Sequence, residues 1–500
     1  MTAVEPHAPV LVGAAQVTRR PDEPAVDAAA LMATAARRAA DDAAPRSASA
    51  EALLAAVGEV WVPEGTWGHR DAGRLVAEAV GAAGATTHRV DVGVTQQALL
   101  AGAAVAIAEG RADVVLVAGG EARLHARAAA AGEVGPEAVQ AADVAPDHVH
   151  VTADLGIDDL EIVRDIVTPA VSYALVDHLL GHRSGRTPAE HRARLGALWA
   201  RFAAVASANP WAWDRSGPSA EEILAVGPGN RPIADPYPKR LCSQWNVDQA
   251  AALLLCSAAA AERFGVDHDR RVFPHVSVVA DHAVPLVARD DLAACPGAEV
   301  AGPLALELAG VGLDDLGPLD LYSCFPAAVE VYAAALGLPL DDPARPLTAT
   351  GGMAFAGGPL NSYVLHALVA MVPALRDDPA RPGLSTSVSG MLTKQGFGVW
   401  AAHPPSDGLR VADVTGEVAA RTTVRRVAPT MAGAVTVASW TVTYDGTTPA
   451  RLVVVAEDDD GTRTIAEARD PEVVGAVAGD VVDLVGRRVA VDDGVLAPLT

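Results

Sequence analysis

The stretch Gly351-Gly352-Met353-Ala354-Phe355-Ala356-Gly357-Gly358-Pro359 carries two glycine pairs and a proline, and an apolar run from 360 to 375 follows it. Glycine adopts backbone conformations with positive φ and lets the chain pass close to a ligand. A loop of this kind that leads into a helix can present backbone N–H groups to a pocket. We therefore expect residues 351–359 to form a tight loop that lines a pocket, followed by a helix over 360–375.

The composition predicts a globular protein. The chain has 500 residues, of which 50% are hydrophobic, 4% aromatic and 20% charged, which predicts roughly two to four domains with a large core. The formal net charge of −24 argues against nucleic acid and anionic membranes as partners. Because no window of about 18 uncharged apolar residues exists and Met1–Pro9 lacks a signal-peptide pattern, we expect neither a membrane span nor secretion.

The cysteines indicate the cellular compartment. The chain has four of them, at Cys242, Cys256, Cys295 and Cys324, without CxxC spacing or flanking histidines. That spacing predicts no metal site. So few cysteines in a long chain are typical of reduced, mostly buried thiols in a cytoplasmic protein.

Residues 1–120 have the pattern of alternating strands and helices. Strands are expected at 10–15, 59–62 and 114–120, and helices at 24–42 and 74–80. The clearest helix starts at Thr95, which can cap it, and ends before Gly110. Alternation of helices with buried strands predicts a parallel or mixed sheet covered on both faces.

Residues 121–240 interrupt this pattern with clustered His, Trp and Pro and a predicted helix over 189–206. Long insertions in α/β proteins often contact the substrate. An equally good interpretation is a subdomain for packing or for dimer contacts, and within it Trp211 and Trp213 either cover a ligand channel or form the subdomain core.

The βα pattern resumes at 241–408 and turns into β structure beyond 408. We expect a helix, or a helix followed by a strand, over 248–260. Two halves rich in βα units then flank the insertion, which indicates an internal duplication. Alternating residues and Asp-Gly turns predict about five strands in residues 409–500, enough for a small barrel of the OB kind. The further expected strands are 276–280, 319–322, 385–390, 396–400, 435–444, 451–456, 481–486 and 488–491, and the further helices are 304–309 and 327–336.

The motifs together resemble the thiolase superfamily, and more narrowly its thiolase-like proteins of the sterol-carrier-protein-x type with an additional C-terminal domain. The resemblance spans nearly all of residues 10–400. It implies a five-layer αβαβα fold with two similar halves and a loop domain, plus a small C-terminal all-β (OB-like) domain. The expected domains are 1–120 and 241–408 for the halves, 121–240 for the loop domain and 409–500 for the β domain. The matching blocks are 92–97, 112–121, 209–213, 237–239, 246–252, 320–326, 351–359 and 393–394.

The same resemblance implies that the usual catalytic residues are replaced. Thiolases form an acyl-cysteine at a helix N-terminus, and the matching position here is Gly93, with no cysteine near it. The second, acid/base cysteine falls near Ser389 and Gly390. The histidine of the Gly-His-Pro loop is Gly358, and the Asn or His that helps bind the thioester oxygen is Tyr322. A conventional acetyl-CoA C-acyltransferase is therefore not expected.

Tyr322 is the remaining candidate for catalysis, since a phenol can donate to an oxyanion or shuttle a proton. The competing interpretation is a packed ring. Thiolase-superfamily retro-aldolases lack the cysteine and use tyrosines near these loops; where they have a second tyrosine, this chain has Phe355, with Tyr363 a helical turn beyond. Cys324 lies on the same strand face as Tyr322. The predicted pocket residues are Gly93, Cys324, Phe355, Gly357, Gly358, Ser389 and Gly390.

Two side chains near these loops have two interpretations each. His366 either replaces the lost histidine or is a core histidine with its hydrogen bonds satisfied. Lys394 either meets a phosphate or carboxylate or makes a packing contact.

Two functions remain open. One is an enzyme acting on a CoA thioester by altered acyl transfer or retro-aldol cleavage, and the other is a non-catalytic binder of acyl-CoA or lipid, or a scaffold for a partner enzyme. In both, a CoA thioester is the expected substrate or ligand, no cofactor is bound, and the protein is a homodimer or a monomer. A tunnel that ends at Tyr322 with Ser389 or His366 within hydrogen-bond distance favours an enzyme, and a cavity filled by Phe355 favours a binder.

Overall fold

The structure is a computed structural model that describes residues 4–137, 139–479 and 482–497. Its first sheet is mixed, with the strand order β1-β8-β4-β2-β3-β5. The six strands are β1 (Pro9–Thr18), β2 (Glu59–Pro63), β3 (Thr86–Val90), β4 (Val114–Ala122), β5 (His148–His150) and β8 (Asp248–Ser257).

The expectation for residues 248–260 is wrong. Residues Asp248–Ser257 form strand β8, and the helix α10 (Ala258–Phe264) begins only after it. Strand β8 lies between β1 and β4 and is buried along its whole length. Because both of its faces are covered, its apolar residues are continuous and do not alternate, so the sequence pattern does not separate strand from helix.

The second sheet repeats the plan of the first. Its order is β10-β11-β12-β9-β13, formed by β9 (Phe273–Asp281), β10 (Leu319–Asp320), β11 (Gly383–Ser389), β12 (Lys394–Ala401) and β13 (Arg410–Asp413). The strands β10-β11-β12-β9 of the second sheet correspond to β2-β4-β8-β1 of the first. In each set of four the first two strands are parallel, and the next two pairings are antiparallel. The predicted similarity of the two halves is confirmed at the level of topology.

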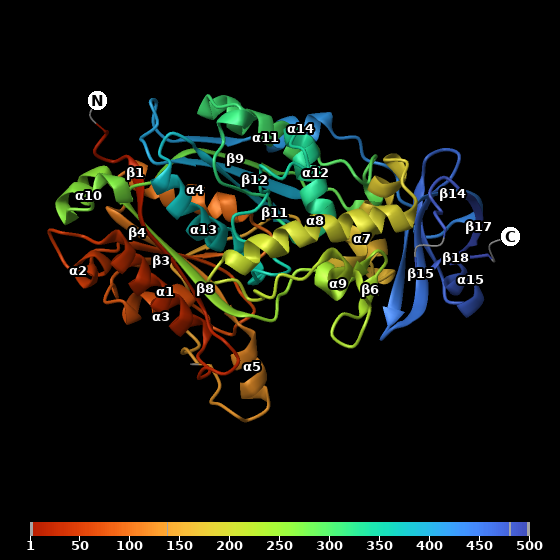
Figure 1. Ribbon diagram of the computed structural model, residues 1–500, viewed down its shortest axis with the longest axis horizontal. Helices are drawn as coiled ribbons and strands as arrows, with labels where there is room; N and C mark the ends of the chain where they lie inside the picture. Colours follow the sequence, from red (N-terminus) through yellow and green to blue (C-terminus); the bar gives the residue numbers. More distant parts are fainter. Residues whose placement is uncertain (1–3, 138, 480–481, 498–500) are drawn as a thin grey trace.

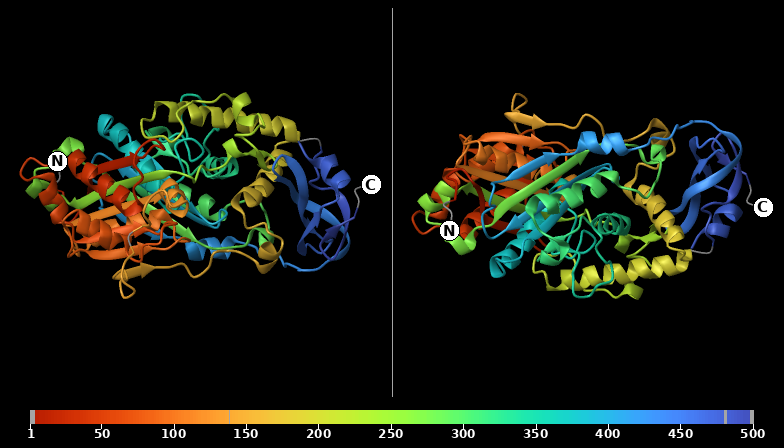
Figure 2. Two further views of the ribbon diagram at one scale, coloured as in Figure 1. Left: turned by 90° about the horizontal axis from the view of Figure 1, so that it is seen from below. Right: turned by 90° about the horizontal axis from the view of Figure 1, so that it is seen from above.

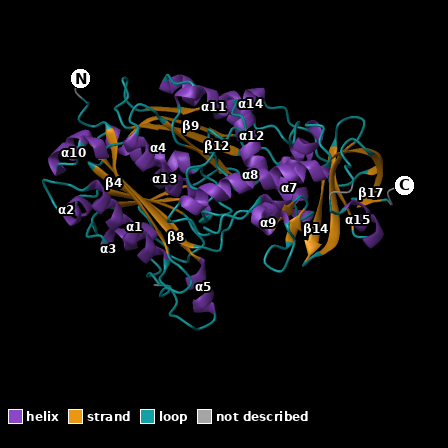
Figure 3. Cartoon of the chain, viewed as in Figure 1, coloured by secondary structure: helices purple, strands orange, loops and turns teal. Residues whose placement is uncertain are grey.

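Helices and sheets alternate in five layers (Figures 1 and 3). Helices α4 (Gln96–Ala108) and α13 (Tyr363–Asp377) lie between the two sheets and contact strands of both. Helices α1 (Ala28–Ala43) and α3 (Ala72–Ala79) cover the outer face of the first sheet, and α2 (Ala50–Ala55) packs on α1. Helices α11 (Pro296–Ala309) and α12 (Pro326–Leu336) cover the second sheet. The expected αβαβα fold is therefore confirmed.

Several helix boundaries differ from the expectation for local reasons. Helix α1 starts at Ala28, because the side chain of Asp27 caps it by accepting from the N–H of Ala30. Helix α4 has the predicted cap, Thr95. Helix α11 starts eight residues before the expected 304, with Pro296 at its first position and Pro303 inside it.

The insertion between the halves is mostly helical. Its elements are α5 (Arg123–Ala130), α6 (Asp159–Val163), α7 (Pro169–Arg183), α8 (Pro188–Ala208), α9 (Ala220–Leu224), β6 (Pro232–Ala234) and β7 (Tyr237–Pro238). Strand β5 also belongs to this stretch, yet it pairs in parallel with β3 and so extends the first sheet.

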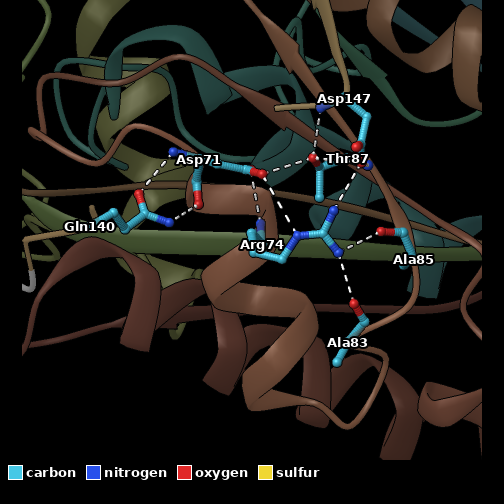
Figure 4. Close-up of polar contacts among 7 residues, drawn as sticks. All are labelled: Asp71, Arg74, Ala83, Ala85, Thr87, Gln140 and Asp147. Atoms are coloured by element: carbon cyan, nitrogen blue, oxygen red, sulfur yellow. Dashed lines mark hydrogen bonds and ion pairs between the residues drawn. The ribbon is translucent and has the colours of Figure 1, made fainter. Parts of the chain in front are cut away.

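Polar contacts hold the segment before β5 against α3 and β3 (Figure 4). The side-chain amide of Gln140 exchanges two bonds of 2.8 Å with the backbone of Asp71. The carboxylate of Asp147 accepts from the N–H of Thr87 at 2.8 Å and from the guanidinium of Arg74 at 2.9 Å. The edge of β3 is thus covered by the same chain.

The C-terminal region forms a closed barrel at one end of the molecule (Figures 1 and 2). Strand β13 and helix α14 (Thr415–Arg421) come first and lie against β9. Then β14 (Ala432–Asp445) pairs with β15 and with β17, and the circle closes through β16 and β18. The remaining elements are β15 (Thr448–Glu457), β16 (Arg463–Ala468), α15 (Pro471–Val477), β17 (Arg488–Asp492) and β18 (Val495–Leu496).

The barrel confirms the expected small C-terminal β unit, but not each strand. Of the expected strand 481–486, Val481 lies outside the described residues, and residues 482–486 form no strand. Strands β16 and β18, which the sequence analysis did not predict, complete the circle instead. The barrel docks on α7 and β6, where the N–H of Asp235 donates to the carbonyl of Val442 at 2.9 Å.

Among the described residues, no helix is long and apolar enough to cross a membrane.

Candidate functional site

Tyr322 lies two residues beyond the end of β10. Its N–H donates to Oγ1 of Thr386 on the neighbouring β11 at 2.8 Å, which fixes the backbone here. The ring stands edge-on to that of Tyr363, with 5.7 Å between the ring centroids, and the residue is 9% exposed. Burial and the nearby Cys324 raise the pKa of Tyr322, and a hydrogen bond from the Gln96 side chain lowers it in part, so the phenol is neutral at pH 7.

The N-terminus of α4 faces this tyrosine. Gln96 is the first residue of the helix, and its Nε2 also donates to Oδ1 of Asn361 at 3.1 Å. Gly93 lies two residues before the cap with a φ of +109°, and a side chain there would meet Thr152 and Leu155 of the insertion. Residues 152–155 therefore cover the Gly93 end of the site.

Tyr173 of α7 connects several of the predicted residues. Its hydroxyl donates to the carbonyl of Gly390 at 3.4 Å, and its ring stacks on Phe325 at 4.8 Å. Burial raises the pKa of Tyr173, and Cys324 and Tyr322 raise it further, so both lie close to its hydroxyl. Tyr322, Cys324 and Gly390 thus come together around a tyrosine that sequence reasoning missed, because it lies in an apolar helix without a motif.

The thiol of Cys324 is not activated. Burial raises the pKa of Cys324 to about 12. Among its neighbours, the Tyr173 hydroxyl is neutral and supplies no positive charge that would favour a thiolate.

The glycine loop has backbone conformations that glycine adopts readily and other residues do not. Gly351, Gly352 and Gly357 have φ values of +98°, +77° and +105°. The carboxylate of Asp320 holds the approach to the loop, because one of its oxygens accepts from Thr348 Oγ1 at 2.9 Å and from the N–H groups of residues 349 and 350. Its other oxygen accepts from the Tyr363 hydroxyl at 3.0 Å. Burial raises the pKa of Asp320, while these donors lower it in part.

Side chains from the protein interior pack against the glycine loop. A Cβ atom at Gly358 would lie 2.1 Å from Oγ of Ser243, and one at Gly357 would lie 2.0 Å from Oε1 of Gln249. Phe355 is 1% exposed and belongs to the main core. The position that the resemblance assigns to a catalytic histidine therefore has no room for a side chain.

Ser389, His366 and Lys394 do not complete a catalytic group with Tyr322. The carbonyl of Ser389 accepts from Oγ1 of Thr393 at 3.0 Å. Nδ1 of His366 bonds to Gln16 on β1 at 2.8 Å, and burial lowers the pKa of His366 to about 3. Lys394 is 1% exposed and pairs with Asp281 at 2.7 Å.

Elsewhere, Asp177, His191 and Glu330 place ligand-type atoms within reach of one ion. The carboxylate of Asp177 bonds to His191 Nε2 at 2.6 Å and accepts from the Tyr237 hydroxyl, and that of Glu330 accepts from Arg194 at 2.9 Å. Because each carboxylate already has protein partners of its own, the arrangement is that of a buried ion-pair network between α7, α8 and α12.

The fold of this chain has counterparts among solved structures. No protein-family model and no curated protein sequence matches the chain. Among solved structures, a monomeric SCP2-thiolase-like protein type 1 from Mycobacterium smegmatis aligns with a TM-score of 0.81 and 27% identity, over 99% of this chain and 100% of that one. This chain has the thiolase-superfamily fold in the form of the SCP2-thiolase-like proteins.

Two thiolases share the fold of this SCP2-thiolase-like chain at lower similarity. They are the dimeric peroxisomal thiolase of Saccharomyces cerevisiae (TM-score 0.56, 14% identity) and an acetyl-CoA acetyltransferase from Syntrophomonas wolfei (TM-score 0.55, 18% identity). Each match covers 80% of this chain and 98% or 100% of the thiolase. About a fifth of this thiolase-like chain therefore has no counterpart in these two thiolases, whereas the M. smegmatis protein matches nearly the whole length of this chain.

Proposed function

We propose that this thiolase-like protein binds a CoA thioester and does not carry out acyl transfer through a Cys/His/Cys set. One observation carries the proposal: the glycine loop keeps its positive-φ backbone while Ser243 occupies the space beside Gly358. The backbone that can line a ligand is present, and the histidine position is closed.

The chemistry of the remaining side chains supports this proposal. With a pKa of about 12, Cys324 is a thiolate in roughly one molecule in 10⁵ at pH 7. Tyr322 and Tyr173 are neutral phenols. Neither His366, which bonds to Gln16, nor Ser389 forms a hydrogen bond with Tyr322. The tight packing of Phe355 likewise favours a binder over an enzyme.

A second candidate function is retro-aldol cleavage of a β-hydroxyacyl-CoA, favoured by the Tyr322–Tyr363 pair next to Gln96. In this reaction the β-hydroxyl loses its proton, the Cα–Cβ bond breaks to give a carbonyl compound, and the enolate of the shortened thioester takes a proton at Cα. The phenol of Tyr322 would donate its proton to Cα, and the proton released by the β-hydroxyl would pass to the Tyr322 oxygen and restore the phenol. Gln96 would stabilise the enolate oxygen.

Calorimetric titration of the full chain with CoA, acetyl-CoA and a long-chain acyl-CoA tests the first proposal, together with mass spectrometry of each mixture. Saturable binding without turnover supports it, and the absence of binding to every one of these ligands overturns it.

The second candidate is tested with a β-hydroxyacyl-CoA and two variants. Tyr322→Phe removes the proposed proton donor, and Tyr332→Phe is the matched control, because Tyr332 is also buried and its hydroxyl donates to the carbonyl of Ser387 at 2.9 Å. Cleavage that is lost in the first variant and kept in the control supports the lyase. No cleavage by the wild type, or equal cleavage by Tyr322→Phe, excludes it.

We further propose that the protein is a cytoplasmic monomer. Strand β5 pairs with residues 88–90 of β3 within the same chain, so a second copy cannot pair with β3 there. Light scattering after gel filtration measures the mass directly, and a mass of twice 51.0 kDa contradicts the proposal.

A further inference from the structure

A cavity of about 150 Å³ lies behind the turn between β11 and β12, away from the glycine loop. The start of α11, the turn residue Thr393 and the helix α14 form its walls, with Val418 and Arg421 contributed by α14. Pockets for drug-sized ligands usually measure about 300–1,000 Å³, so this cavity has room for a small group but not for a whole acyl-CoA.

Arg289 brings a buried positive charge to this cavity. The residue is 6% exposed, and a guanidinium keeps its proton in proteins. Its Nε donates to the carbonyl of Val284 at 3.3 Å and its Nη2 to the carbonyl of Met391, whereas Nη1 has no hydrogen-bond partner. Within the described residues Arg289 forms no ion pair. A buried charge without an ion-pair partner is unfavourable, and an anion in the cavity would offset this cost.

Two further groups in the wall favour an anion. Nε2 of His282 is buried and also has no partner. The 14-residue helix α11 begins in the wall with Pro296 and Gly297, and its N-cap, Cys295, makes no side-chain cap. The partial positive charge of a helix N-terminus attracts anions.

The acidic residues in the wall already have partners. Asp290 pairs with Arg425 at 2.6 Å, and Asp291 pairs with Arg183 at 2.6 Å. Their negative charges are therefore compensated outside the cavity. Glu161 interacts with the charge of Arg289 without forming an ion pair with it, because its carboxylate accepts from the N–H of Val287 at 2.8 Å, and Nη1 of Arg289 keeps no partner.

We propose that this cavity is a binding site for a small anionic group, a phosphate or a carboxylate, held by Arg289, His282 and the N-terminus of α11. Because α14 contributes Val418 and Arg421 to the wall, residues beyond the second sheet take part in the site. The proposal does not depend on CoA binding at the glycine loop.

The test uses the full chain and inorganic phosphate or acetate as probes, with sodium chloride at equal ionic strength as the reference. Thermal unfolding and calorimetry should show saturable binding of at least one probe. Ala294→Leu fills the cavity without removing a charge, and His282→Ala removes one donor, so each should weaken binding at least tenfold. Ala334→Leu, on the exposed side of α12, is the matched control and should bind as the wild type does.

Binding that Ala294→Leu leaves unchanged, or the absence of any saturable effect in the wild type, overturns the proposal. Arg289→Lys is a further variant, but it also breaks two hydrogen bonds to backbone carbonyls. If Arg289→Lys fails to fold, the result for Ala294→Leu decides. CoA added as a competitor identifies the source of the anion. Competition supports a phosphate of CoA, and independent binding supports a free anion.

Discussion

Replacing Gly357 by alanine should destabilise the protein through two separable terms. The first is backbone strain at a φ of +105°, where an L side chain costs about 1–2 kcal/mol. The second is the collision of the new Cβ with Gln249 Oε1, at 2.0 Å. Gln249 cannot move freely, because its Nε2 donates to the carbonyl of Ala356 at 2.8 Å and to Thr18 Oγ1 at 3.1 Å.

Loss of these buried bonds adds about 1–3 kcal/mol, so the free energy of unfolding should fall by roughly 2–5 kcal/mol in total. Gly81→Ala is the matched control, since Gly81 has a φ of +85° and nothing within 4 Å of its Cβ position. It should cost only the backbone term. Gln249→Ala removes the obstructing amide, and in that background Gly357→Ala should also cost about 1–2 kcal/mol.

Urea unfolding of the four variants and the wild type, followed by tryptophan fluorescence, measures these free energies. Equal losses for Gly357→Ala and Gly81→Ala would refute the reasoning, because they would mean that Gln249 gives way at no cost. An unchanged cost of Gly357→Ala in the Gln249→Ala background would refute it as well. The first result would imply that the glycine loop has room for a side chain at position 357, and the second that Gln249 does not set the cost.

Three more outcomes follow from the buried polar groups. Burial, with His148 and His150 close by, lowers the pKa of His88 to about 4. Its contribution to stability is therefore complete above pH 6.5 and is lost as the pH falls towards 4. The protection of amides in β3 and β5 against hydrogen exchange, taken relative to their intrinsic exchange rates at each pH, should fall over this range, and less so in His88→Phe. Burial alone would lower the pKa of His191, but Asp177 raises it on balance. The contribution of His191 to the free energy of unfolding is therefore complete below pH 6.5 and is lost as the pH rises through the raised pKa. Urea unfolding of the wild type and of His191→Gln at pH 6 and pH 9 measures this loss. Tyr444→Phe removes the hydroxyl that donates to Asp235 at 2.7 Å and should weaken the docking of the barrel by about 1–3 kcal/mol. The barrel of this variant should be cleaved by a protease faster than that of the wild type. An unchanged rate of proteolysis contradicts this role of Tyr444.

Most of the fold could be predicted from the sequence because its patterns are local. Thr95 and Gly110 mark the ends of α4 by capping and by a positive φ, and both depend on the immediate neighbours in the chain. Strand β8 could not be predicted, since an apolar run buried on both faces has the same composition as a core helix. Whether β5 pairs with β3 also depends on a partner about 60 residues away.

The sequence by itself determined the glycine loop, the order of the motifs and the absence of cysteine and histidine at the expected positions, because these are properties of residue identity and spacing. Only the tertiary structure decided that Ser243 occupies the space beside Gly358, that Tyr173 joins Tyr322 and Cys324, and that a partnerless nitrogen of Arg289 is buried beside a cavity. These facts depend on distances between side chains far apart along the chain. Because burial removes solvent from Tyr173, Tyr322 and Cys324, it raises their pKa values and keeps these side chains protonated.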